Sequence, residues 1–175
     1  VMMNSKIKIN NINPNHLIAL IKVLKKMGAD LKVLKNSIIN YPSKNLKGTS
    51  VTTAPYPGFP TDLQAQIMSL MSLVNGNSQI KETVFETRFM HVPELNRLGA
   101  KIKLSKDKAY IKGGQKFKGA QVMASDLRAS VGLVLAALCA EGNTTINRVY
   151  HLDRGYEKIE RGIGKLGIQI KRVKN

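Results

Sequence analysis

Two aspartates that each begin an apolar segment are the first residues of this sequence whose types and positions could do chemistry. Asp62 follows Thr61 and Asp126 follows Ser125, directly before runs of apolar residues with helical spacing. A carboxylate in a first helical turn interacts favourably with the helix dipole, and this structural role explains Asp126. A positioned carboxylate can also act as a general base, which contributes roughly 10²- to 10⁴-fold to a rate. Position alone leaves both roles open for Asp62.

Three arginines occupy positions that suit the binding of an anion. Arg88 and Arg154 follow predicted strands at equivalent positions, and Arg128 lies in the first turn of an apolar helix. A cation in that turn opposes the helix dipole and is costly to bury unless an anion needs it. A guanidinium group binds a phosphate or a carboxylate through two parallel hydrogen bonds. The alternative for each arginine is a solvated side chain that pairs at most with a carboxylate.

A duplicated segment must position these residues. Residues 61–88 predict a helix, a glycine turn and a strand with an arginine at its exit, and residues 125–154 repeat this order. The apolar positions of the first helix recur 64 residues later, with the i, i+4, i+7, i+8, i+11 spacing of one helix face. They are Leu63, Ile67, Leu70, Met71 and Val74, and Leu127, Val131, Val134, Leu135 and Leu138. After each glycine the strand is predicted to begin at Ile80 or Ile146.

The repeat continues beyond these segments and predicts an α/β fold. A second helix follows each arginine, ends at a glycine cap and continues as a half-buried strand. These glycine-centred segments are 27–33, 98–104 and 166–171, and the hairpin partners of the first two are 37–41 and 109–112. Alternating helices and strands favour right-handed crossovers. Because the helices that follow Asp62 and Asp126 are apolar nearly all round, we expect helices inside and sheets outside.

The whole chain, residues 1–175, is predicted to form a single domain of repeated units of about 70 residues, divided at 1–53, 54–124 and 125–175. The first unit lacks its interior helix and the last stops after one strand of its ribbon, so both are expected to be incomplete. A seven-residue insertion, 54–60, precedes Thr61 and has no counterpart before Ser125. Its three prolines predict a stiff, water-facing loop, which favours the functional role for Asp62.

The net charge of +17 suggests an anionic partner, but not nucleic acid. Of the 28 cationic side chains, 21 are lysines, and most are scattered singly or in pairs. The sequence has no arginine-rich run, no basic stretch interleaved with aromatic residues, and no zinc-finger or helix-turn-helix signature. We interpret the charge as a lysine-coated surface, with a phosphate-bearing small substrate as the alternative.

The remaining composition excludes several classes of site. The single cysteine, Cys139, allows no internal disulfide and fits a reducing cytoplasm; its apolar helix predicts a small buried side chain. The sequence contains no run of about 18 apolar residues, so it predicts no membrane span. The three histidines, His16, His91 and His151, are too dispersed for a metal site, and no cofactor-binding fingerprint is present.

Four motifs resemble the UDP-N-acetylglucosamine enolpyruvyl transferases of peptidoglycan synthesis. They are TAPYPGFPTDLQAQ at 53–66, ETVFETRFMHVPEL at 82–95, QVMASDLRAS at 121–130 and YHLDRGYE at 150–157. The likeness covers essentially the whole chain, whereas the related enolpyruvyl-shikimate-phosphate synthases share the fold without these motifs. It implies an inside-out α/β barrel domain with threefold pseudo-symmetry. It also implies that the catalytic cysteine, with a lysine and further arginines, lies in a missing N-terminal domain.

The resemblance implies a transferase that moves the enolpyruvyl group of phosphoenolpyruvate to the 3-hydroxyl of UDP-N-acetylglucosamine and releases phosphate. Such an enzyme works in the cytoplasm, without metal or cofactor, in cell-wall biogenesis, and through it in cell shape, the cell cycle and division. The roles it implies are catalytic base for Asp62, phosphoenolpyruvate binding for Arg88, Arg128 and Arg154, and backbone contact to the UDP-sugar for Val84.

Each of these implied roles has a simpler alternative. Read alone, Val84 is a core strand residue, and Asp126 is a supporting residue. For the chain as a whole, the alternative function is a non-catalytic basic half-domain that binds anions or a partner chain. By itself the chain is expected to be inactive.

Overall fold

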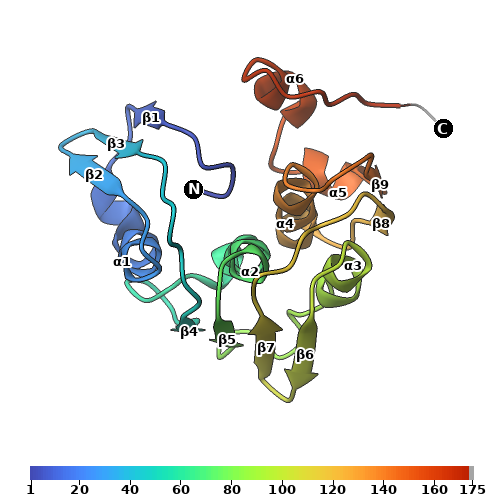
Figure 1. Ribbon diagram of the computed structural model, residues 1–175, viewed down its shortest axis with the longest axis horizontal. Helices are drawn as coiled ribbons and strands as arrows, with labels where there is room; N and C mark the ends of the chain where they lie inside the picture. Colours follow the sequence, from blue (N-terminus) through green and yellow to red (C-terminus); the bar gives the residue numbers. More distant parts are fainter. Residues whose placement is uncertain (174–175) are drawn as a thin grey trace.

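The computed structural model describes residues 1–173, in which helices and strands follow one another in three groups (Figure 1). The first group contains β1 (Ile7–Asn10), α1 (Ile18–Lys26), β2 (Leu31–Leu34) and β3 (Ser37–Asn40). The second contains β4 (Ser50–Thr52), α2 (Gln64–Leu73), β5 (Asn77–Lys81), α3 (Val92–Arg97), β6 (Ile102–Ser105) and β7 (Lys108–Lys112). The third contains β8 (Gln121–Met123), α4 (Leu127–Ala137), β9 (Thr145–Asn147), α5 (Tyr150–Asp153) and α6 (Ile159–Gly164).

Each group contributes one sheet, and the first two sheets share a strand order. In the first sheet β3 lies between β1 and β2, and all neighbours are antiparallel. In the second, β7 lies between β5 and β6 in the same way, and β4 joins the far side of β5 as a parallel strand. The third sheet is the parallel pair β8 and β9. The recurrence agrees with the repeat seen in the sequence.

The helices α2 and α4 lie together in the middle of the molecule, with the sheets around them (Figure 1). A β-carbon on Gly132 of α4 would lie 2.9 Å from the β-carbon of Ala65 on α2, so only glycine permits this approach. Across the same contact Ser69 donates a hydrogen bond of 3.0 Å to the carbonyl of Gly132. The expected arrangement, with helices inside and sheets outside, is therefore confirmed.

The predicted glycine caps are present where the chain leaves an outer helix for a strand. Gly28 after α1 and Gly99 after α3 have φ angles of +96° and +105°, which residues other than glycine rarely adopt. The strands β5 and β9 begin slightly earlier than predicted, at Asn77 and Thr145.

The prediction of a strand within 166–171 is wrong. Residues 168–173 have no regular secondary structure, although Gly167 makes the expected left-handed turn. An extended segment becomes a strand only when another strand satisfies its backbone hydrogen bonds, and none in residues 1–173 lies beside this one. The last two residues of the predicted unit 125–175 lie outside the described residues.

Candidate functional site

One carboxylate oxygen of Asp62 accepts hydrogen bonds from two arginines. Nη1 of Arg88 lies 2.9 Å from Oδ1, and Nε of Arg128 lies 2.8 Å from the same atom. Arg88 comes from the loop after β5 and Arg128 from the first turn of α4. The fold thus brings together three of the residues singled out in the sequence. The Asp62 side chain is 59% exposed, so a ligand can reach it.

The arginines keep the Asp62 carboxyl group ionised. Partial burial by itself raises the pKa of this group, but the hydrogen bonds and charges of Arg128 and Arg88 outweigh that effect. The net result is a pKa below the ordinary value for aspartate. Asp62 is therefore a carboxylate at neutral pH, as an acceptor of protons must be.

Arg88 is held in place by more than its bond to Asp62. Its Nη1 atom also lies 3.3 Å from Oγ1 of Thr61, and its guanidinium carbon lies 4.2 Å from the ring centroid of Phe85. The Arg88 side chain is 19% exposed. A guanidinium that is half-buried against an aromatic ring and fixed by two acceptors is pre-oriented toward Asp62.

The second aspartate, Asp126, has a different task. It is the N-cap of α4, and its Oδ1 atom accepts hydrogen bonds from the backbone N–H groups of Arg128 at 2.8 Å and Ala129 at 3.1 Å. Asp62 lies instead inside a short 3₁₀ helix, Thr61–Leu63, where no side chain caps the helix. Its carboxylate is therefore available to the arginines, while that of Asp126 is occupied by the backbone.

The proline-rich insertion fixes the start of α2. Its ends are joined by a backbone hydrogen bond of 2.9 Å from Ala54 to Phe59, and Gly58 donates another of 2.8 Å to Pro55. The loop is water-facing at Tyr56, which is 76% exposed. The prediction is wrong for Phe59, which is buried in the core because the loop turns its ring inward. This anchor holds the chain directly before Asp62.

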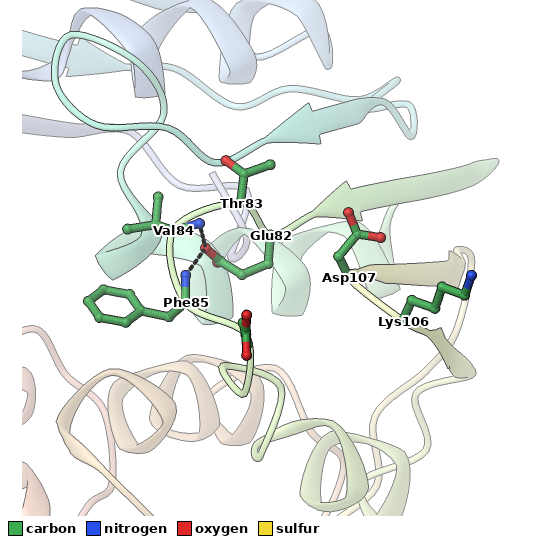
Figure 2. A pocket seen from close by; sticks show the side chains of 7 residues that line it. Glu82, Thr83, Val84, Phe85, Lys106 and Asp107 are labelled. Carbon is green, nitrogen blue, oxygen red and sulfur yellow. Dashed lines mark hydrogen bonds between the residues drawn. The ribbon is translucent and has the colours of Figure 1, made fainter.

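Val84 lies in a loop rather than in a strand, because β5 ends at Lys81. It helps to line a pocket of about 440 Å³ with Glu82, Thr83, Phe85, Glu86, Lys106 and Asp107 (Figure 2). Its side chain is half-buried, so the alternative of a core strand residue is wrong. The Val84 backbone N–H donates a hydrogen bond to Glu82, which fixes the backbone at the edge of the pocket.

Glu82 is the residue of this region that the sequence analysis did not single out. It is 4% exposed, and it accepts hydrogen bonds from the backbone of Val84 and Phe85 (Figure 2). The repeat contains a signal for it, since Arg148 stands at the equivalent position, six residues before Arg154, as Glu82 stands six residues before Arg88. Because the acidic residue is present in only one copy of the repeat, its role must depend on contacts that are specific to that copy.

Arg154 stays apart from the cluster around Asp62. It follows α5 and is exposed, and its side chain makes no hydrogen bond or ion pair within residues 1–173. The next residue, Gly155, lies against Leu127, where an added β-carbon would be 3.0 Å from the leucine side chain. Arg154 therefore lies near the beginning of α4, the same end of the helix that carries Arg128.

Within the described residues, no group of three or more histidine, cysteine, aspartate or glutamate side chains could hold a metal ion. His91 is buried, and burial lowers its pKa to about 4, so it is neutral at pH 7. Cys139 is half-buried against the core, and burial raises the pKa of its thiol. No helix in residues 1–173 has both the length and the apolar character to cross a membrane.

Comparisons with known proteins place these residues in a wider context. A model of the family described as EPSP synthase (3-phosphoshikimate 1-carboxyvinyltransferase) matches residues 1–163. The UDP-N-acetylglucosamine 1-carboxyvinyltransferase of Pelagibacter ubique is 52% identical over 172 residues, which are 98% of this chain and 41% of that protein. The enzyme of the same name from Helicobacter pylori is 51% identical over 98% of this chain and 40% of its own length.

Solved structures give the same picture of the fold. The enolpyruvyl transferase NikO from Streptomyces tendae superposes with a TM-score of 0.88 at 28% identity, covering 96% of this chain and 40% of that one. EPSP synthase from Acinetobacter baumannii superposes with a TM-score of 0.73 at 16% identity, which is a likeness of fold alone. The chain spans about two fifths of the length of these relatives.

Proposed function

This chain belongs to the EPSP synthase family of carboxyvinyltransferases, and from that premise we propose that it forms part of the active site of a longer enzyme. The proposed enzyme transfers the enolpyruvyl group of phosphoenolpyruvate to the 3-hydroxyl of UDP-N-acetylglucosamine. The acceptor follows from the relatives of about half-identical sequence, which carry that name. This reaction is the first committed step of peptidoglycan synthesis, which ties the enzyme to the cytoplasm, cell shape and cell division.

The observation that carries the proposal is the pairing of Asp62 with Arg88 and Arg128 at an accessible position. Phosphoenolpyruvate bears a phosphate and a carboxylate, and both compete with Asp62 for guanidinium groups. When the substrate binds, the arginines turn to it and leave an ionised carboxylate beside the reaction centre. The same residues thus bind the donor and expose the base.

The chemistry assigned to this chain is the addition of the sugar hydroxyl to the donor. Asp62 accepts the proton of the 3-hydroxyl as the sugar oxygen forms a bond to C2 of phosphoenolpyruvate, and an acid in the remaining portion of the enzyme protonates C3. Phosphate then leaves C2, and C3 loses a proton to restore the double bond. Arg88, Arg128 and Arg154 stabilise the charge on the phosphate and the carboxylate throughout.

The backbone of Val84 and the organisation of the chain complete the proposal. We assign Val84 to the UDP-sugar because it lies on the pocket at the end of β5, four residues before Arg88. Residues 1–175 are proposed to form one domain of three units, 1–53, 54–124 and 125–175. The recurring strand order supports three units, but β4 and β8, the last strands of the first two units, each pair with a strand of the unit that follows. The proposed partner of this domain is the remaining portion of the enzyme.

A chimera tests the function directly. This chain replaces the matching 40% of the Helicobacter pylori relative, to which it is 51% identical. We expect phosphate release that requires both phosphoenolpyruvate and UDP-N-acetylglucosamine, measured by a coupled phosphate assay. A chimera that folds, as judged by circular dichroism, but releases no phosphate contradicts the proposal and favours a non-catalytic, anion-binding domain.

In the chimera, Arg154→Lys is expected to raise the KM for phosphoenolpyruvate by roughly tenfold, the equivalent of one charge-assisted hydrogen bond. Lysine keeps the charge but loses the planar pair of donors that grips a phosphate or carboxylate. The KM for the UDP-sugar should change little. Arg97→Lys is the control, because Arg97 is exposed and pairs with Glu94 away from the cluster. A defect confined to the UDP-sugar would assign Arg154 to the other substrate.

A further inference from the structure

Glu82 is a buried carboxylate that accepts five hydrogen bonds, none of them from Asp62 or from the three arginines assigned to phosphoenolpyruvate. Removing a carboxylate from water is costly unless its oxygens are satisfied by donors. The five hydrogen-bond donors around Glu82 offset the cost of burying its charge. They come from separate segments of the chain, so Glu82 links these segments to one another.

The Oε1 atom joins the end of β4 to the loop that carries Val84. It accepts hydrogen bonds of 2.7 Å from the hydroxyl of Thr53, 2.9 Å from the N–H of Val84 and 3.2 Å from the N–H of Phe85. Figure 2 shows both backbone bonds wrapping the loop around the carboxylate. This oxygen thereby shapes the pocket wall.

One hydroxyl group connects the Oε2 atom to the cluster of Asp62, Arg88 and Arg128. It accepts a hydrogen bond of 2.9 Å from Oγ1 of Thr61, the residue before Asp62. A hydroxyl has a single proton to donate, so the lone pairs of Thr61 face the other way. There Nη1 of Arg88 donates to Thr61 at 3.3 Å and to Asp62 at 2.9 Å, one hydrogen to each.

We propose that Glu82 is a positioning residue for enolpyruvyl transfer, which orients Arg88 toward Asp62 through the hydroxyl of Thr61 and rests on the proposed function for its kinetic effect. Because an ionised carboxylate can only accept hydrogen bonds, it dictates which way the Thr61 hydroxyl points. That direction gives Arg88 its second acceptor. Through Oε2 and Thr61, Glu82 thus orients Arg88, and through Oε1 it fixes the loop that forms the pocket wall.

The substitution Glu82→Gln separates this role from simple packing. The amide has the same shape and retains one oxygen for Thr53, Val84 and Phe85, but places an N–H₂ group where Oε2 lies. A donor there turns the Thr61 proton away from residue 82 and toward the side from which Arg88 donates, which weakens the hydrogen bond between Arg88 and Thr61. The fold can tolerate the change because Gln64, which donates to Oε2 at 3.4 Å, has a buried Oε1 without a partner and can rotate its amide.

The first experiment follows the titration of the Asp62 carboxyl carbon by NMR in the 175-residue chain. The groups that face this carboxylate are Arg88 and Arg128, and both lower its pKa. Weakening the Arg88 bond must therefore raise the Asp62 pKa. We expect that rise in Glu82→Gln and in Thr61→Val, which removes the hydroxyl at nearly constant volume.

Two control variants should leave the Asp62 titration as in the wild-type chain. Thr61→Ser keeps the hydroxyl, and Glu94→Gln neutralises a half-buried glutamate that also accepts a backbone hydrogen bond, from Met123 at 3.0 Å. An unchanged Asp62 titration in folded Glu82→Gln or in Thr61→Val overturns the proposal. If Glu82→Gln does not fold, Thr61→Val alone decides.

The second experiment measures the chimera. Glu82→Gln should lower kcat/KM for phosphoenolpyruvate by about tenfold and move the acidic limb of its pH profile to higher pH, whereas Glu94→Gln should do neither. A uniform loss of activity with an unmoved pH limb would mean that Glu82 only supports the fold. If the parent chimera is inactive, the proposed function fails, and the Asp62 titration still tests the orientation of Arg88.

Discussion

Replacing Asp62 with alanine in the chimera is expected to lower turnover by at least ~10²-fold, the contribution of a positioned general base. The fold should survive, because the side chain is 59% exposed and exposed ion pairs contribute only about 0–1 kcal/mol to stability. The KM for phosphoenolpyruvate should not rise, since Arg88 and Arg128 lose the carboxylate that competes with the substrate. The measurement is steady-state kinetics with each substrate varied.

Asp126→Asn is the matched control for this loss. Asparagine retains a side-chain oxygen that can accept the backbone N–H bonds of Arg128 and Ala129, so the cap of α4 is preserved. We expect a much smaller effect than that of Asp62→Ala. Equal turnover for Asp62→Ala and its parent would remove Asp62 from the catalytic role.

The 175-residue chain by itself is expected to release no phosphate from phosphoenolpyruvate and UDP-N-acetylglucosamine above the uncatalysed background. It spans about two fifths of the length of its relatives, and we expect the proton donor and further substrate-binding groups to lie in the rest of that length. Groups that act as a unit do not contribute shares of a rate, so losing several removes nearly all of it.

This second expectation has its own control. The remaining portion of the Helicobacter pylori relative, added as a separate polypeptide, should restore some phosphate release if the two parts associate. Robust turnover by the purified chain alone would contradict the assignment of essential groups to the other portion. The readout in both cases is the phosphate assay used for the chimera.

The sequence by itself determined the parts of the fold that depend on local pattern. The spacing of apolar residues repeated 64 positions apart predicts two interior helices, because a helix buried on all sides must be apolar on nearly every face. The glycines after the outer helices predict their ends, because Gly28 and Gly99 adopt left-handed backbone angles. Nearby residues suffice for both predictions.

Sequence pattern failed where a structure depends on a distant partner. The alternation within 166–171 has the form of a strand, but a strand exists only when another one bonds to it. Phe59 belongs to a loop that is predicted to face water, yet its ring is buried in the core, because removing an apolar side chain from water is favourable.

Tertiary structure alone decided which of the candidate residues act together. Asp62, Arg88 and Arg128 meet because α2 and α4 pack so closely that only glycine fits beside Ala65 at position 132. Arg154, although equivalent to Arg88 in the repeat, follows α5 and makes no contact with Asp62. Glu82 gained its importance only from burial among donors on three segments. The types and spacing of residues in the sequence identify the groups that could react. Which of these groups contact one another depends on how segments far apart in the chain pack together.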